Sequence, residues 1–405
     1  MKIPFSPPYI DKDVINEVLD TLTSGWITSG PKVKALEIET AKLASVEYVL
    51  CVNSATSGLM LAMHWFGVGP GDEVIIPAYT YAATALAVFN LGAKPVMAEV
   101  NNDFNINIDS VRKLINRSTK AIIPVDIAGW PCDYDELYKL VSDPEIADSF
   151  NPRGEVQKKL GRILILSDAA HSLGAVYKNR PSASVSDISV FSFHAVKNVT
   201  TAEGGAICIS LPKSFSGIEV YTKMRLMSLN GQTKDAYSKS KAGGWRYDIV
   251  LPGYKMNMPD VCAAIGLAQI LKYKNHILIE RKRIALHYTN RFKEFDWAIL
   301  PPLQNNDKET SYHLFALRIE GFAENQRDLM IEEISKKGVS VNVHFIPLPL
   351  FKFFREEGYK IEDYPQAYSC YINEISLPIY PQLDAVAVDY IVDVIVKSYY
   401  KVLNK

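Results

Sequence analysis

Seven short apolar runs recur between residues 48 and 210, and stretches with the apolar period of a helix separate them. The runs are residues 48–52, 73–77, 94–100, 121–125, 163–166, 188–193 and 206–210. Runs without polar interruption are typical of strands buried on both faces of a parallel sheet. Because they alternate with helical stretches, the pattern predicts a mostly parallel, seven-stranded α/β sheet with helices on both faces.

The pattern changes near residue 259. We expect a long helix up to residue 292, a strand at 312–319, a helix at 323–337, a strand at 339–344 and a last helix at 384–403. A chain of 405 residues exceeds what one compact core usually holds. We therefore predict a large domain over residues 1–258, with a first helix capped by Asp11, and a smaller C-terminal α/β domain over residues 259–405.

The charge balance argues against several classes of partner. Lys and Arg number 44 and Asp and Glu number 45, so the net charge is −1 and no basic excess favours nucleic acid or an anionic membrane. No run is long and apolar enough to span a bilayer, and residues 1–8 contain no signal-peptide core. The five cysteines show no metal-binding spacing and are interpreted as buried free thiols. We expect a cytoplasmic protein without a metal site.

Residues suited to chemistry gather where the apolar runs end, which is where α/β sheets bind ligands. Lys197 lies between two predicted strands, where a partly desolvated amine is a nucleophile that can hold a carbonyl compound. Asp168 follows a buried strand and is costly there unless a cation or hydrogen-bond donors pair with it. Residues 53–58 form a small polar turn at a helix start, which suits a phosphate group. The ordinary alternatives are a solvent-facing loop lysine, an aspartate that caps the next helix, and a plain serine N-cap.

Residues 191–205 resemble the lysine segment of the DegT/DnrJ family of sugar aminotransferases, which use pyridoxal 5′-phosphate (PLP). Family members typically read Ser-Phe-His, two residues, Lys, two residues, then Thr-Thr-Gly-Glu-Gly-Gly. The chain matches this pattern from Ser192 to Gly205 and departs from it only at Ala202. Further matching segments follow in the family's order from Ser24 to Pro347. The resemblance implies an α/β protein of the fold-type I PLP-dependent transferase class.

The resemblance also implies a role for each matching residue. Lys197 would bind PLP covalently, and Asp168 would keep the ring nitrogen protonated so that the ring accepts electrons. The other cofactor contacts would be Ala55, Thr56, Tyr81, His171 and Ser192, with Asn257 reaching across the interface of a homodimer. The substrate contacts would be Trp26, Thr28, His194, His344 and Phe345. A structural role stays open for several of these, such as a core tyrosine at 81 or a buried histidine at 171.

The implied reaction transfers an amino group from glutamate to a nucleotide-linked keto sugar in two half-reactions. Residues 200–203 and His194 resemble the branch that acts at sugar C4. Residues 195–198 and 252–255 resemble enzymes that make UDP-linked 4-amino sugars for surface polysaccharides. Three alternatives remain: a C3 aminotransferase, a 3-dehydratase of the family, in which histidine replaces the lysine, and a non-catalytic regulator, which would have lost cofactor contacts that this chain keeps.

Two polar stretches are interpreted from composition alone. Residues 141–161, with two prolines and two glycines, are expected to form a surface insertion, to which we assign no function. Residues 231–253 are glycine-rich and are expected to form a long ordered loop, a kind of segment that is often functional.

Overall fold

The computed structural model describes residues 1–234 and 245–404 and contains the seven-stranded sheet that the apolar runs predict. The strand order is β1-β9-β8-β5-β4-β2-β3. Strands β3, β2, β4, β5 and β8 are parallel to one another, whereas β9 is antiparallel to both β8 and β1. The bounds are β1 (Tyr48–Val52), β2 (Glu73–Pro77), β3 (Lys94–Ala98), β4 (Thr119–Ile122), β5 (Leu164–Asp168), β8 (Ile188–Ser192) and β9 (Gly205–Ile209).

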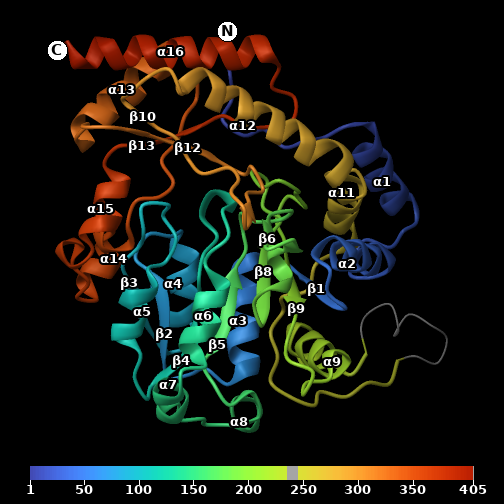
Figure 1. Ribbon diagram of the computed structural model, residues 1–405. Helices are drawn as coiled ribbons and strands as arrows, with labels where there is room; N and C mark the ends of the chain where they lie inside the picture. The colour runs from blue at the N-terminus through green and yellow to red at the C-terminus, as the bar shows by residue number, and fades with distance from the viewer. Residues whose placement is uncertain (235–244, 405) are drawn as a thin grey trace.

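Helices cover both faces of this sheet, as Figure 1 shows. Helices α3 and α4 cover one face: Gly58 of α3 packs against Val190, and Thr84 of α4 donates to Asp168. The other face packs against α2 and α11, and also against α6, whose Tyr134 Oη is 2.6 Å from Ser167 Oγ. Strand β1 illustrates why its run is continuously apolar: Leu50 and Val52 belong to the first core cluster, and Val49 and Cys51 to the second. The helices of this part are α1 (Lys12–Thr23), α2 (Pro31–Ala44), α3 (Ala55–Phe66), α4 (Ala82–Phe89), α5 (Ile108–Leu114), α6 (Tyr134–Val141), α7 (Pro144–Ser149), α8 (Glu155–Leu160), α9 (Gly217–Ser228) and α11 (Asp260–Ile270).

The start of α2 depends on a residue that is distant in sequence. Gly30 occupies the N-cap position and has no side chain to accept the free amides of the first turn. Asp260, buried at the start of α11, accepts the N–H groups of Gly30, Lys32 and Val33 at 2.8, 3.1 and 3.0 Å. This carboxylate therefore caps one helix from the first turn of another and fixes the two helices together.

A separate core of apolar residues, distinct from the two clusters on the faces of the large sheet, forms in the C-terminal part. A three-stranded antiparallel sheet, in the order β10-β12-β13, packs with α12, α13 and α16 at the top of Figure 1. The bounds are β10 (Ala298–Ile299), β12 (Phe315–Ile319), β13 (Glu374–Leu377), α12 (Leu278–Phe292), α13 (Glu324–Lys336), α14 (Lys352–Glu356), α15 (Pro365–Tyr371) and α16 (Ala385–Leu403). A small third sheet joins β11 (Lys308–Glu309) to β6 (Val176–Tyr177) and β7 (Arg180–Pro181).

Two C-terminal elements differ from the prediction. The strand expected at 339–344 is wrong, because this segment makes only isolated bridges through Val339 and Asn342. The strand that pairs with β12 is instead β13. This strand was not expected, because its four residues begin with a glutamate and show no clear apolar pattern. The long helix expected up to residue 292 is broken into α11, a π-helical turn at Tyr273–Ile277 and α12.

The two polar stretches have different outcomes. Residues 141–161 hold the short helices α7 and α8, whose Ile146 and Gln157 are buried against the rest of the molecule. The loop expected at 231–253 falls partly outside the described residues, because 235–244 are not among them. Within residues 1–234 and 245–404, no helix has both the length and the apolar character needed to cross a bilayer.

Candidate active site

A cavity of about 400 Å³ opens at the carboxyl ends of the parallel strands. Most of the residues singled out from sequence line it, although they come from segments as far apart as α3 and the chain beyond α13. These residues are Ala55, Thr56, Tyr81, Asp168, His171, Ser192, His194, Lys197, His344 and Phe345.

Lys197 lies in the turn that connects β8 to β9. Its N–H donates to His194 O at 2.9 Å, and the N–H of Phe193 donates to Gly204 O at 2.9 Å, which closes the turn. The side chain keeps some exposed surface within the cavity, but protein surrounds it, and this desolvation lowers the pKa of Lys197 to about 8. The amine therefore loses its proton far more readily than an ordinary lysine, as a nucleophile requires.

Asp168 is the last residue of β5 and is buried. Its Oδ2 accepts the hydroxyl of Thr84 at 2.8 Å, and its Oδ1 accepts the N–H of Ala170 at 3.2 Å. Both donors are uncharged, and burial raises the pKa of Asp168 in spite of them and of the nearby Lys197. The site thus holds a desolvated carboxylate at the cavity wall that a cationic ring nitrogen would stabilise.

The polar turn before α3 presents a helix N-terminus to the cavity. Ser54 caps the helix by accepting the N–H of Ser57 at 3.1 Å, and Ala55 and Thr56 are its first residues. Strand β9 passes so close that a Cβ on Gly205 would lie 2.7 Å from the Ala55 nitrogen, so only glycine fits there. Ser192 is the cross-strand partner of Gly205 and brings its hydroxyl to the same corner. The corner combines a helix dipole with hydroxyl groups and can hold a phosphate.

His171 is held in one orientation and one protonation state. Its ring lies between His313, with centroids 4.4 Å apart, and Phe345, with centroids 5.7 Å apart. The N–H of Ala128 donates to its Nδ1 at 3.3 Å, and burial holds the pKa of His171 well below its usual value. The neutral ring therefore carries its proton on Nε2. That nitrogen is a hydrogen-bond donor for a ligand in the cavity.

Three residues of the site have no clear signal in the sequence. Thr84 lies on α4 and was not distinguished from the apolar helix around it. His313 lies in a segment interpreted only as a strand, and its Nδ1 is 2.9 Å from Asn198 Oδ1. Asn198 donates from Nδ2 to Ser311 O at 2.9 Å, so it ties the lysine turn to the C-terminal part. Histidine is rare in this chain, with seven residues, and this rarity is the only feature of the sequence that could have drawn attention to His313.

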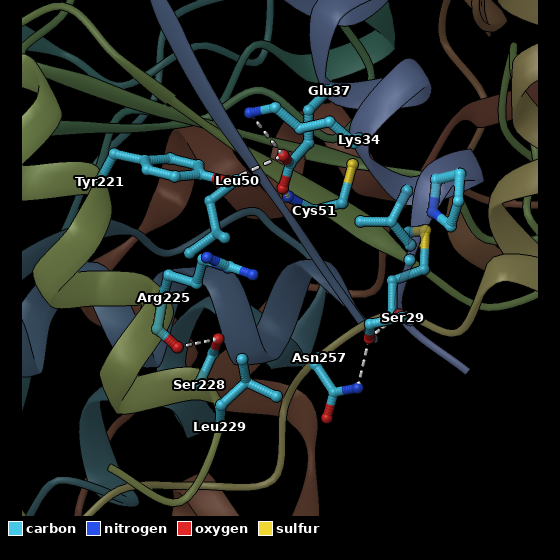
Figure 2. A pocket seen from close by; sticks show the side chains of 14 residues that line it. Ser29, Lys34, Glu37, Leu50, Cys51, Tyr221, Arg225, Ser228, Leu229 and Asn257 are labelled. Carbon is cyan, nitrogen blue, oxygen red and sulfur yellow. Dashed lines mark hydrogen bonds and ion pairs between the residues drawn. The ribbon is translucent and has the colours of Figure 1, made fainter. Parts of the chain in front are cut away.

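Three of the predicted site residues lie outside this cavity. Trp26 and Thr28 are in the loop between α1 and α2, where Trp26 Nε1 donates to Ser29 O at 3.3 Å. Asn257 lines a second cavity of about 450 Å³ and donates from Nδ2 to Ser29 Oγ at 2.6 Å (Figure 2). Their roles at a cofactor or substrate stay predictions, which require a second subunit or a movement of the loop.

The residues present fit PLP on their own chemistry. The partly neutral Lys197 suits the aldehyde, the desolvated Asp168 suits the ring nitrogen, and the α3 N-terminus suits the phosphate. Tyr81, at the α4 N-cap, is 64% exposed, so its ring is available to cover a planar group.

Comparison with known proteins identifies the family of the chain. The profile of the DegT/DnrJ/EryC1/StrS aminotransferase family matches residues 8–149 and 154–396. A curated relative is the spore coat polysaccharide biosynthesis protein SpsC of Bacillus subtilis, 34% identical over 97% of this chain and 96% of its own length. Among solved structures, the PMP form of the putative sugar aminotransferase Spr1654 of Streptococcus pneumoniae is 42% identical, with a TM-score of 0.95 over 99% of this chain and all of its own.

A more distant solved structure has the same fold. It is PseC of Helicobacter pylori, an aminotransferase of pseudoaminic acid biosynthesis, which is 27% identical with a TM-score of 0.85 over 99% of this chain and all of its own. The family and the fold class expected from sequence are both confirmed, and the chain belongs to the DegT/DnrJ/EryC1/StrS aminotransferase family.

Proposed function

We propose that this aminotransferase uses PLP to move an amino group from glutamate to C4 of a UDP-linked 4-keto-hexose. The observation that carries the proposal is the meeting of Lys197, Asp168 and the α3 N-terminus in one cavity. The product would be an amino sugar for surface polysaccharide. The polysaccharide pathway of SpsC supports this setting. The five free cysteines support a location in the reducing cytoplasm.

PLP, when bound, supplies the electron-accepting ring that allows a proton to leave the carbon next to the amino group. Lys197 would hold the aldehyde carbon and, once displaced by the substrate amine, would carry the proton between the two carbons that exchange it. Asp168 would stabilise the positive charge on the ring nitrogen, and Thr84 holds Asp168 in place. His171 would donate from Nε2 to the ring oxygen, and Phe345 and His313 prevent the imidazole from turning.

The position of amination is tested by product analysis. UDP- and dTDP-linked 4-keto-hexoses and a 3-keto-hexose are each incubated with the PLP-loaded enzyme and glutamate. NMR spectroscopy then locates the new amino carbon. We expect amination at C4, with UDP preferred over dTDP. Amination of the 3-keto sugar alone would contradict the C4 assignment, and a PLP-loaded enzyme that aminates no keto sugar would contradict the proposed function.

The charges of the cavity support our proposal that the enzyme is a homodimer with shared sites. Lys197 is the only Lys or Arg among the described residues that line it, and Lys197 is engaged with the cofactor. Glutamate and a nucleotide diphosphate are anions that need further cations. Asn257 can contribute a donor to a second subunit, because its Nδ2 uses one hydrogen for Ser29 Oγ at 2.6 Å and has a second hydrogen to donate to an anion. Figure 2 shows Asn257 beside Ser29, within the second cavity.

We predict that Asn257→Ala weakens PLP binding about tenfold, the scale of one lost hydrogen bond to a charged group. The measurement is a PLP titration of the apoenzyme. In mixed dimers that combine Asn257→Ala with Lys197→Ala subunits, an Asn257 that acts across the interface restores one complete site. Half of the sites should then bind PLP covalently with wild-type affinity. Mixed dimers without this restoration, or an active monomer, would contradict the shared site.

A further inference from the structure

Two buried side chains lie directly behind His344. Glu374 and Ser376 are two residues apart on β13, so they point to the same face of the strand, and both are completely buried. His344 Nδ1 is 2.9 Å from Ser376 Oγ, and Ser376 Oγ is 2.5 Å from Glu374 Oε1. The second carboxyl oxygen of Glu374 accepts the backbone N–H of His344 at 2.9 Å. An unbroken hydrogen-bonded chain therefore runs from the cavity wall to a buried carboxyl group.

The direction of this chain depends on whether Glu374 carries a proton. A carboxylate accepts the Ser376 hydroxyl proton, so Ser376 Oγ accepts from His344 Nδ1–H, and Nε2 faces a ligand as a lone pair. A protonated Glu374 must carry its proton on Oε1, because Oε2 accepts the backbone N–H. It then donates to Ser376, Ser376 donates to Nδ1, and His344 Nε2 carries the proton. The imidazole stays neutral in both states.

We propose that His344, Ser376 and Glu374 form a proton relay that protonates, through His344 Nε2, the carbonyl oxygen that the amino group replaces. The inference rests on the proposed function. The attacking amine nitrogen bonds to the carbonyl carbon and gives one of its protons to the oxygen. The His344 Nε2–H bond then breaks as a second proton moves to that oxygen, and the C–O bond breaks to release water, while the nitrogen keeps its remaining proton. Nδ1 takes the hydroxyl proton of Ser376, Ser376 takes the proton of Glu374, and Glu374 becomes a carboxylate. When the donor leaves as its keto acid, water provides the new carbonyl oxygen and its proton returns along the same path.

The charges around the relay suit proton storage at Glu374. Arg318 is its cross-strand neighbour on β12, Arg327 of α13 donates to its main-chain carbonyl at 3.4 Å, and Tyr79 donates to His344 O at 2.7 Å. In spite of both arginines, burial raises the pKa of Glu374 to about 8. The carboxyl group is therefore largely protonated near neutral pH and releases its proton as the pH rises through 8.

His344 cannot act as an ordinary imidazolium acid. Burial, together with the nearby Lys197, lowers the pKa of His344 to about 3. The neighbouring His171 and His313 are also held neutral by burial, and the apolar ring of Phe5 stacks on His344 with centroids 5.5 Å apart. A neutral imidazole donates a proton efficiently only when a second group replaces it at the other nitrogen. Ser376 and Glu374 are that replacement source, so they are positioning residues for His344.

The relay is tested by nitrogen-15 NMR of histidine-labelled apoenzyme between pH 6 and 10. In the wild type, His344 should change from the Nε2–H to the Nδ1–H form near pH 8 without becoming charged. In Glu374→Gln, the amide donates to Ser376 at every pH, so His344 should stay in the Nε2–H form. In Ser376→Ala, the change near pH 8 should disappear. Ser398→Ala, a buried serine on α16 outside the cavity, is the matched control and should behave as the wild type.

Turnover provides the second readout. Glu374→Gln and Ser376→Ala should each lower kcat about 10²-fold, within the range of a lost proton-transfer group. In the wild type, kcat should fall as the pH rises through 8, and both variants should lose this decrease. A His344 tautomer that does not change with pH, or that changes equally in Ser376→Ala, would overturn the relay even in an active enzyme. An apoenzyme with the expected tautomers that aminates no keto sugar would instead contradict the proposed function.

Discussion

Replacing Lys197 with alanine is expected to abolish turnover while the fold remains intact. The variant loses both the amine that binds PLP and the group that moves the proton, and proton transfer alone contributes about 10²- to 10⁴-fold. The measurements are kcat with glutamate and a keto sugar, and thermal unfolding of the apoenzyme. Because desolvation lowers the pKa of Lys197 to about 8, the charged lysine opposes folding below that pH. Unfolding of the variant at pH 7 should therefore not occur at a lower temperature.

Lys197→Arg is the matched control for this result. Arginine keeps a positive charge in the cavity but does not lose its proton, so it neither binds a carbonyl carbon nor carries a proton between carbons. Its turnover should be as low as that of the alanine variant. Turnover near the wild-type rate in either variant would refute the role assigned to Lys197.

Replacing Asp168 with asparagine should lower kcat at least about 10²-fold, the scale on which one well-placed electrostatic partner acts. Asparagine has nearly the same shape and accepts the same Thr84 and Ala170 donors, but it does not keep the ring nitrogen charged. The substitution lowers kcat, but it should not lower the stability of the fold. Burial raises the pKa of Asp168 in the folded protein, so its free-energy cost to folding begins as the pH rises through the ordinary pKa of an aspartate and is complete above the raised pKa. The apoenzyme of the variant should unfold at the same or a higher temperature near pH 7.5.

Asp126→Asn is a close control for the same substitution. Asp126 is also completely buried, burial also raises its pKa, and it does not line the cavity. Its Oδ1 accepts from Cys132 N and Tyr134 Oη at 2.8 and 2.9 Å, which an asparagine oxygen can still do. This variant should keep kcat within a few-fold of the wild type. An unchanged kcat in Asp168→Asn would remove the electron-acceptor argument.

The sheet and the residues at its carboxyl edge were predictable from the sequence for a physical reason. Strands buried on two faces require continuous apolar runs, and β1 and β8 contribute alternate residues to the two cores. Once the parallel order is known, the ends of β5 and β8 must lie at one edge, so Asp168 and Lys197 had to converge there. The division at residues 258/259 stays a prediction.

The relay strand was not predictable in the same way. Strand β13 has only four residues, and two of them, Glu374 and Ser376, are polar side chains that are buried because they contact His344. A local pattern contains no information about such a distant partner. Ala202 is a second example: it has φ 65°, a conformation that favours glycine. That backbone angle accounts for the glycine that the family pattern has at this position, which the sequence alone left unexplained.

The most direct test of the account is an absorbance spectrum of the purified protein, loaded with PLP, before and after glutamate is added. We predict a visible band from the cofactor bound to Lys197, which disappears on addition of glutamate as a near-ultraviolet band of the aminated cofactor appears. Lys197→Ala should show no lysine-bound band under the same conditions. A wild-type protein that shows no visible band even with excess PLP would contradict the central claim that this cavity is the site of PLP-dependent amino transfer.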